Sequence, residues 1–198
     1  MLKAEQIRER IRRPFCGRFV GFVAGNLLNH IDMRSSARPY LEKLAAQTGE
    51  TVHLVQRGGV HCVYIDKVEP TINSVRMVSS IGMRQPLYCT VVGKAILAEI
   101  SAQEIKCIWN SSDIQAHTRH TITLWDQFFK EIEGVRQQGY ALDNEENELG
   151  VRCIAVSIRD TGPVRYAVSV SVPVSRMTDD NLERIKDLLL ATKSNFSG

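Results

Sequence analysis

Two runs near the C-terminal end of the chain alternate between bulky apolar residues and small or polar ones. Residues 151–158 and 164–172 each place bulky apolar side chains at every second position. These positions are Ile154, Val156 and Ile158 in the first run and Val164, Tyr166, Val168, Val170 and Val172 in the second. Because successive side chains of a strand point to opposite faces of a sheet, the pattern predicts two β-strands that share a bulky core face.

The other face of the same two strands is lined mostly by small residues, several of which can form hydrogen bonds. They are Val151, Cys153, Ala155, Ser157, Ala167, Ser169 and Ser171. Such a face either receives a closely packed helix or leaves a hollow, and a hollow with a few convergent polar groups is typical of a small-molecule site. The strands alone leave both possibilities open.

An acidic segment just before the first of these strands favours the hollow. Asp143 precedes the strand that Gly150 opens, so its carboxyl group is expected at the rim of the small-residue face, near Cys153, Ser169 and Ser171. The neighbouring acids are predicted to form a solvated turn; they are Glu145, Glu146 and Glu148.

Three segments in the first half of the chain also predict strands. Residues 51–57 and 60–68 are rich in β-branched residues and flank a Gly58-Gly59 turn, which is typical of a β-hairpin. Residues 72–79 are expected to add a third strand.

Two helices are predicted around these strands. The first begins near Asp32, has Pro39 close to its first turn, where proline is tolerated, and ends at Gly49. The second is capped by Thr90, and Gly93 would allow the chain to pack closely against it.

Three further helices complete the predicted order of elements. A capping box from Ser101 to Glu104 opens a short helix that ends at Trp109. An aromatic stripe between Thr123 and Gly139 predicts a longer helix whose apolar face belongs to the core, and the last helix is expected over 178–192. Strands joined by hairpins and flanked by helices indicate an α+β domain with a mainly antiparallel sheet.

Composition narrows the class of protein. A length of 198 residues suits one ordinary domain. No apolar run approaches the roughly 18–20 residues that span a bilayer, and the N-terminus lacks the pattern of a secretory signal. The cysteines show no C-x-x-C spacing, which favours reduced thiols and a cytoplasmic location; they are Cys16, Cys62, Cys89, Cys107 and Cys153.

Positive charge is concentrated at the N-terminus. Residues 1–18 hold six basic and two acidic residues, whereas the formal charge of the whole chain is only +3. Residues 1–17 are interpreted as a basic N-terminal arm, which is either a solvated end or a segment that contacts phosphates. The remainder of the chain is nearly neutral and gives no electrostatic indication of nucleic-acid binding.

Metal and phosphate chemistry fit the residues poorly. His53, His61 and Cys62 suggest a metal site, but a paired strand would distribute them over both of its faces, whereas metal ligands must converge. The Gly93-Lys94 pair lacks the glycine pattern of a P-loop. We therefore expect no metal and no cofactor.

A thiol enzyme is the alternative from another functional class. A nucleophilic Cys153 or Cys89 would need a base within reach. No histidine follows His120, and His53 and His61 are expected on a distant hairpin. We therefore predict that the protein is not an enzyme.

Three segments together resemble a known family. They read A-R-P-Y-L-E-K-L-A-A-Q-T-G-E-T-V-H-L at 37–54, R-Q-P-L-Y-C-T-V-V-G-K-A-I-L-A at 84–98 and D-N-E-E-x-x-x-G-V-R-C-I-A-V at 143–156, followed by a strand ending S-V-S-V-P. In this order they resemble the effector-binding domain of IclR-type bacterial transcription regulators. The resemblance implies a GAF/PAS-like effector-binding domain over 32–195 and a linker-helix remnant over 18–31.

The same resemblance implies a set of pocket residues. The backbone amides of Val91 and Val92 at a helix start would contact the ligand, together with the polar groups of Asp143, Cys153, Ser169 and Ser171. Met77 and Val151 would provide apolar lining. Tyr88 stands where the family often has histidine, which is expected to change the shape of the pocket.

The function implied is a sensor of a small carboxylate effector, such as a hydroxy-, keto- or sugar acid, that controls DNA binding in transcription regulation. Partners would be the effector and further copies of the chain, as a dimer or tetramer, with no membrane. DNA binding is expected only if a helix-turn-helix is supplied, because the residues before 18 show no such pattern. The alternative within the family is a module that only oligomerises.

Overall fold

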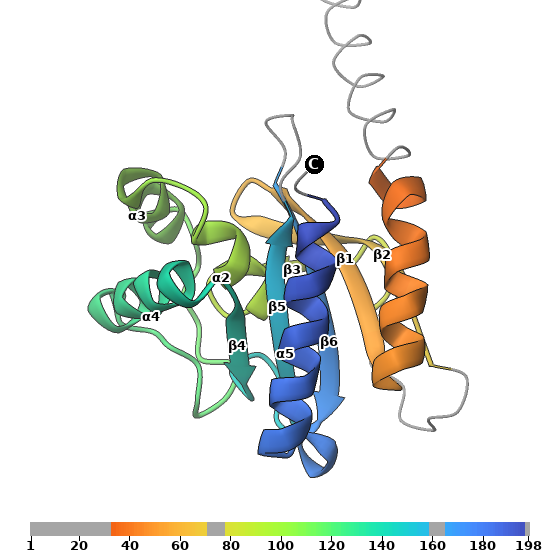
Figure 1. Cartoon of the computed structure of the whole chain (residues 1–198). Coiled ribbons are helices and arrows are strands. Elements are labelled where there is room, and N and C mark those ends of the chain that lie inside the picture. The colour runs from red at the N-terminus through yellow and green to blue at the C-terminus, as the bar shows by residue number, and fades with distance from the viewer. Residues whose placement is uncertain (1–32, 71–77, 159–164, 197–198) are drawn as a thin grey trace, which may run out of the picture. The chain divides into compact units, whose positions relative to one another are not determined.

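A six-stranded antiparallel sheet in the order β3-β2-β1-β6-β5-β4 organises the fold. The computed structural model describes residues 33–70, 78–158 and 165–196. The chain divides into two compact units, 1–37 and 38–198, and the sheet belongs to the second (Figure 1). This arrangement confirms the predicted α+β class.

The strands largely follow the predicted alternation. Their bounds are β1 Thr51–Gly58, β2 His61–Val68, β3 Arg84–Pro86, β4 Ala141–Asn144, β5 Val151–Ile158 and β6 Tyr166–Pro173. The β1–β2 hairpin is confirmed. In the β5–β6 pair Cys153 lies opposite Ser171 and Ile154 opposite Val170, so the small face and the bulky face form as expected.

Two strand predictions need correction or lie outside the described residues. The segment predicted as the third strand falls mostly within 71–77, which is not described, and the third strand of the structure is the short β3. Strand β4 was not predicted: Asp143 and Asn144 belong to it and pair with Cys153 and Arg152. Asp143 is therefore held by a strand ladder and not by a loop.

The bounds of the helices from α2 onward are α2 Val91–Leu97, α3 Ala102–Asn110, α4 Trp125–Gln138 and α5 Asp179–Ser194, with a 3-10 turn η1 at Val174–Arg176. Helices α2 and α3 begin at the predicted hydroxyl caps, whereas α4 has Leu124 at its N-cap and no side-chain cap. The Thr90 hydroxyl accepts a hydrogen bond from the N–H of Gly93, and the Ser101 hydroxyl accepts one from that of Glu104. Helix α4 begins at Trp125, slightly later than predicted, and ends where Gly139 adopts a left-handed φ of 83°.

The described part of the first helix spans 33–48. Pro39 lies inside it and not in its first turn, so that prediction was wrong. Proline costs a helix one backbone hydrogen bond; the burial of Leu41 and Leu44 on the same helix offsets that loss.

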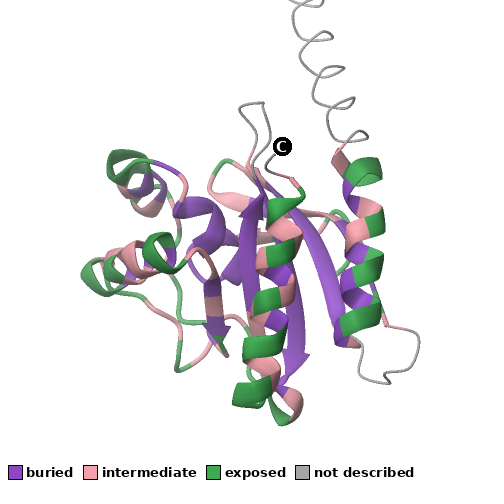
Figure 2. Cartoon of the chain, viewed as in Figure 1, coloured by how far each residue is buried: buried purple, intermediate pink, exposed green. Residues whose placement is uncertain are grey.

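Helices cover the sheet, and the central strands are buried along most of their length (Figure 2). Helix α2 packs on β5 and β6 at the small-residue face, where Ala155 and Ala167 join one buried cluster with Val92 and Ile96. Helix α5 lies across β5 and β6 (Figure 1). Of the two possibilities for the small-residue face, the closely packed helix is therefore confirmed for the part under α2.

Helix α2 approaches the preceding backbone very closely at Gly93. A Cβ atom added there would lie 2.0 Å from the carbonyl oxygen of Leu87. The close packing predicted for Gly93 is thus confirmed, and the contact fixes α2 to the segment that enters it from β3.

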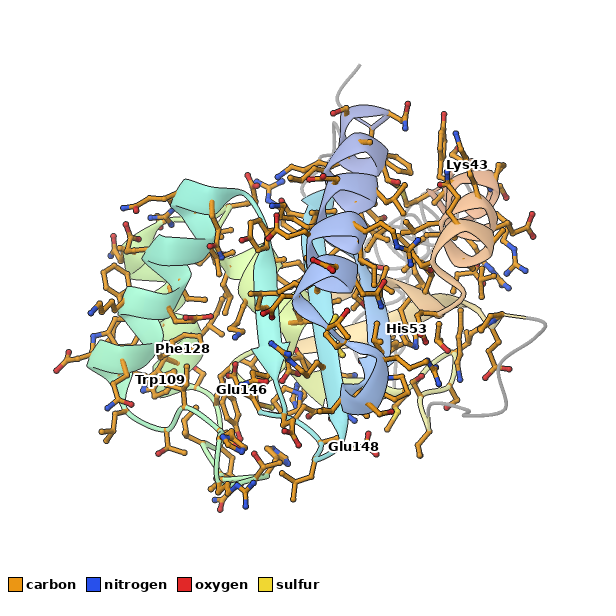
Figure 3. The ribbon with its side chains drawn as sticks, turned by 60° about the horizontal axis from the view of Figure 1, so that its bottom comes forward. Lys43, His53, Trp109, Phe128, Glu146 and Glu148 are labelled. Carbon is orange, nitrogen blue, oxygen red and sulfur yellow. The ribbon has the colours of Figure 1, made fainter. Side chains whose placement is uncertain are left out.

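The aromatic stripe of α4 is part of the core, as predicted. Phe128 is buried, and its ring centroid lies 4.5 Å from that of Trp109 on α3. Figure 3 shows these two side chains together beside α4, well away from His53. In the described part of the chain, no helix has the length and hydropathy to cross a membrane.

A candidate ligand pocket on the small-residue face

A cavity of about 270 Å³ opens at the end of the small-residue face. The sheet contributes His53, Tyr64, Gln85, Asp143, Val151, Cys153 and Ser171, and loops contribute Val78, Ser79, Met83, His117, Asn147 and Glu148. The volume is slightly below the roughly 300–1,000 Å³ of pockets for drug-sized ligands. A cavity of this size fits a small metabolite.

The structure brings together four of the eight predicted site residues. Asp143, Val151, Cys153 and Ser171 line the cavity. Three others are buried but do not line it: Val91, Val92 and Ser169. Met77 lies outside the described residues. Position along β5 therefore divides the small-residue face, with Ala155 in the cluster under α2 and Cys153, two residues earlier on the same face, at the cavity.

Asp143 is the most perturbed acid at the cavity. Asp143 is 5% exposed, and its Oδ1 accepts a hydrogen bond of 2.7 Å from the N–H of Glu146. Burial is the main reason that the pKa of Asp143 is raised from 3.8 to about 7; the charge of Glu146 acts in the same direction, and that hydrogen bond and the charge of Lys94 act against it. Near neutral pH this carboxyl group can therefore either donate or accept a hydrogen bond.

This shift predicts a stability that falls with rising pH. Between about pH 4 and 7 the native Asp143 keeps a proton that the unfolded chain has released, so the free energy of unfolding decreases as the pH rises. Between pH 6 and 8 the free energy of unfolding of Asp143→Asn is expected to fall by about 1 kcal/mol less than that of the wild type. Urea titrations of both proteins at the two pH values measure this difference. Identical slopes with pH would contradict the burial of a protonated carboxyl group.

The two candidate nucleophiles, Cys153 at the cavity and Cys89 in the core, are held as thiols. Burial raises the pKa of Cys153 far above its ordinary value and that of Cys89 to about 12. The Cys153 Sγ donates to the Ser171 hydroxyl at 3.2 Å. The prediction that His53 lies far from Cys153 was wrong, because both line the cavity; burial, helped by the charge of Lys67, lowers the pKa of His53 to about 3. Neither thiol has the low pKa of a nucleophile.

Glu146 is buried in an ion pair, which corrects the predicted solvated turn. The fully buried Lys94 on α2 donates to Glu146 at 2.6 Å and to Glu131 on α4 at 3.0 Å. Burial alone lowers the pKa of Lys94, but the charges of the two glutamates outweigh it and raise that pKa. Glu148 is exposed at the cavity rim, as expected for a solvated acid, and Figure 3 shows both acids.

Further bonds hold the loop that carries these acids. The hydroxyls of Thr118 and Thr121 donate, each at 2.6 Å, to the carbonyl oxygens of Glu145 and Glu146 respectively. The loop is thus fixed by its own backbone as well as by Lys94. It supplies Asn147 to the cavity, together with the exposed Glu148.

Several cavity residues were not expected from the sequence. His53, Tyr64, Ser79 and Gln85 belong to the β1–β2–β3 side of the sheet. The available signal was the alternation of β1, which puts His53 beside Ser169 once β1 pairs with β6. Tyr88 does not line the cavity, and its hydroxyl is hydrogen-bonded to the backbone of Gln115.

A metal site is not formed among the residues described. No group of three or more histidine, cysteine, aspartate or glutamate side chains gathers there as a metal site would require. His53 lines the cavity, whereas Cys62 lies near the Thr90 hydroxyl at 3.7 Å.

Comparison with known proteins places the chain in a family. Residues 25–197 match the family model described as bacterial transcriptional regulator IclR C-terminal. The chain is 41% identical over 158 residues to the DNA-binding transcriptional repressor YiaJ of Escherichia coli strain K12, a match that covers 78% of this chain and 56% of that protein. The chain therefore spans little more than half the length of this relative.

Solved structures agree with the sequence match. The IclR protein of Thermotoga maritima superposes with a TM-score of 0.80 at 35% identity, covering 90% of this chain and 73% of that one. A double mutant of the PobR inducer-binding domain from Acinetobacter, in complex with 3-hydroxybenzoic acid, has a TM-score of 0.75 at 25% identity, with coverage of 83% and 97%. The chain belongs to the IclR family of bacterial transcriptional regulators and spans the C-terminal domain of that family.

Proposed function

We propose that this domain binds a small carboxylate metabolite in the pocket and thereby controls the DNA binding of a transcription regulator. Hydroxy-, keto- and sugar acids are the expected class. The observation that carries the proposal is the cavity itself, in which Asp143, Cys153 and Ser171 face one small hollow. The 3-hydroxybenzoic acid bound by the PobR domain is a hydroxy acid and supports this class.

The polar groups of the cavity suit a ligand with two different ends. Hydroxyl and amide donors can hold a carboxylate by charge-assisted hydrogen bonds. Asp143 repels a carboxylate when ionised, but it can accept a hydrogen bond from a ligand hydroxyl. In this arrangement the donors come from lining side chains such as Ser171 and not from the amides of Val91 and Val92, which are buried away from the cavity.

Control of DNA binding follows from differential affinity. A ligand shifts a regulator between conformations only if it binds one of them more tightly. We propose that the domain acts in a dimer or tetramer and that the DNA contact is made by a helix-turn-helix part. The name of YiaJ, a DNA-binding repressor nearly twice as long as the match, supports this arrangement.

The test is a thermal-shift screen of the chain with pyruvate, lactate, gluconate and 3-hydroxybenzoate. Ligand at about 100 times its Kd stabilises the folded state by roughly 2.7 kcal/mol, which raises Tm by several degrees. Asp143→Asn and Ser171→Ala are expected to reduce the rise.

Ser157→Ala is the matched control. Ser157 lies on β5 and on the same face as Cys153, but its hydroxyl donates to Glu99 at 2.6 Å, outside the cavity. The control should keep the full ligand-induced rise. An unchanged Tm with every acid would leave a module that only oligomerises, and an equal loss in all three variants would contradict the pocket assignment.

A further inference from the structure

A second polar contact lies on the β1 side of the cavity, three strands away from Asp143. His53 on β1 is 2% exposed, and its Nε2 is 2.7 Å from the hydroxyl oxygen of Ser79. Both residues line the cavity. The imidazole packs edge-on against Tyr64 with a centroid distance of 5.1 Å, so the ring has one fixed orientation toward Ser79.

The burial of the other ring nitrogen determines the direction of this hydrogen bond. Nδ1 of His53 is buried and has no hydrogen-bond partner among the described residues. A proton on Nδ1 would be a buried N–H without an acceptor, which proteins avoid more strictly than a buried acceptor without a donor. We therefore place the proton of the neutral ring on Nε2, from which it is donated to Ser79.

This assignment leaves the proton of the Ser79 hydroxyl available to the cavity. A serine hydroxyl has one donor and two acceptor positions, and His53 occupies one of the acceptor positions. The backbone of Ser79 is also fixed, because the ammonium group of Lys67 donates to its carbonyl oxygen at 2.7 Å. Ser79 is thus presented as a donor, and the Lys67–Glu69 ion pair, 2.9 Å between nitrogen and oxygen, holds its backbone in place.

The position of the Ser79 hydroxyl matters because the charged residues of the cavity are acidic. Among the described residues that line the cavity, two are acids, Asp143 and Glu148, and none is a lysine or arginine. Within this described lining, the donors to a ligand carboxylate are neutral side chains, and a donor remote from Asp143 suits the carboxylate best. Ser79 meets both conditions, since β5 and β6 separate the strand of His53 from that of Asp143.

Building on the proposed function, we infer that Ser79 donates a hydrogen bond to the carboxylate of the ligand and that His53 is the positioning residue for that hydroxyl. The ligand then lies across the sheet, with its carboxylate toward β1 and its hydroxyl or carbonyl end toward Asp143. Acids with a polar group at the end remote from the carboxylate are the preferred class.

The test is isothermal titration of the whole chain with gluconate, pyruvate and 3-hydroxybenzoate, and with the matching primary amides. For an acid that binds the wild type, Ser79→Ala should raise the Kd about 10- to 100-fold, as expected for a lost hydrogen bond to a charged group. The Kd of the amide should change only a few-fold. Ser79→Thr, which retains the hydroxyl, should stay within a few-fold of the wild type.

The role of His53 is tested by coupling. His53→Phe keeps an aromatic ring but removes the donor to Ser79. It should raise the Kd of the acid about as much as Ser79→Ala does. If the two residues act as one unit, the double variant is no weaker than Ser79→Ala alone. Fully additive losses would overturn the positioning role. If His53→Phe does not fold, the comparison of Ser79→Ala with Ser79→Thr still decides the donor role.

The two proposals fail in different ways. Binding of none of these acids to the wild type would contradict the carboxylate function and, with it, this inference. An acid that binds the wild type and Ser79→Ala with equal Kd would overturn only the inference about Ser79. A loss shared equally by acid and amide would also overturn it, because Ser79 would then be recognising something other than the charge.

Discussion

Gly93→Ala is expected to destabilise the domain by about 3 kcal/mol or more, which is enough to unfold a marginal protein. The added Cβ would meet the carbonyl oxygen of Leu87 at 2.0 Å and two further backbone atoms of Leu87 at 2.6 Å. Backbone cannot rotate aside as a flexible side chain can, so α2 would have to move off its neighbour. Urea unfolding followed by circular dichroism measures the loss.

Gly134→Ala is the matched control. Gly134 lies inside α4, and a Cβ added there would have nothing within 4 Å. Alanine should therefore stabilise this helix by about 0.5–1 kcal/mol relative to glycine. The two substitutions are chemically identical and are expected to have opposite signs. If Gly93→Ala unfolded at the same urea concentration as the wild type, the close approach of α2 to Leu87 would be wrong.

Lys94→Met is expected to cost about 3–5 kcal/mol. Lys94 is fully buried, and its ammonium group bonds to Glu131 and to the buried Glu146. Methionine preserves most of the side-chain volume but leaves the Glu146 carboxylate buried without its cation. The cost of that uncompensated charge exceeds the attraction that the pair contributed. The midpoint of urea unfolding at pH 7 is the measurement.

Two variants separate the charge from the shape. Lys186→Met removes a lysine of α5 that pairs with Glu183 on the surface, and its unfolding midpoint should stay close to that of the wild type. Lys94→Met combined with Glu146→Leu replaces the buried pair by apolar groups and should recover most of the loss. A double variant no better than Lys94→Met would show that packing around Lys94, and not the stranded charge, sets its effect.

Local patterns in the sequence were sufficient for much of the fold. The two faces of β5 and β6 follow from alternation, and the caps at Thr90 and Ser101 follow from the preference of hydroxyls for helix starts. The close packing at Gly93 could also be predicted, because only glycine permits such an approach. Each of these signals involves residues that are near one another in the chain.

Features that depend on distant residues were not predicted. The acidic neighbours Glu145 and Glu148 predict a solvated turn for Glu146, and only the tertiary fold brings Lys94 to it. Strand β4 has four residues, too few for a clear period. His53 reaches the cavity because β1 pairs with β6, a partnership that no local pattern specifies, and the loop residue Ser79 is hydrogen-bonded to it there.

The pairing of β1 with β6 also has a consequence for folding kinetics. These strands lie at the centre of the sheet, yet Thr51 and its partner Ser171 are more than a hundred residues apart in the chain. Contacts of such long range require a costly loop closure and slow the folding of a domain. During synthesis the ribosome releases β1 long before β6, so the edge of β1 that pairs with β6 stays unpaired until β6 has been made. Chaperones that shield such edges are therefore expected to influence how much of this protein reaches the native state.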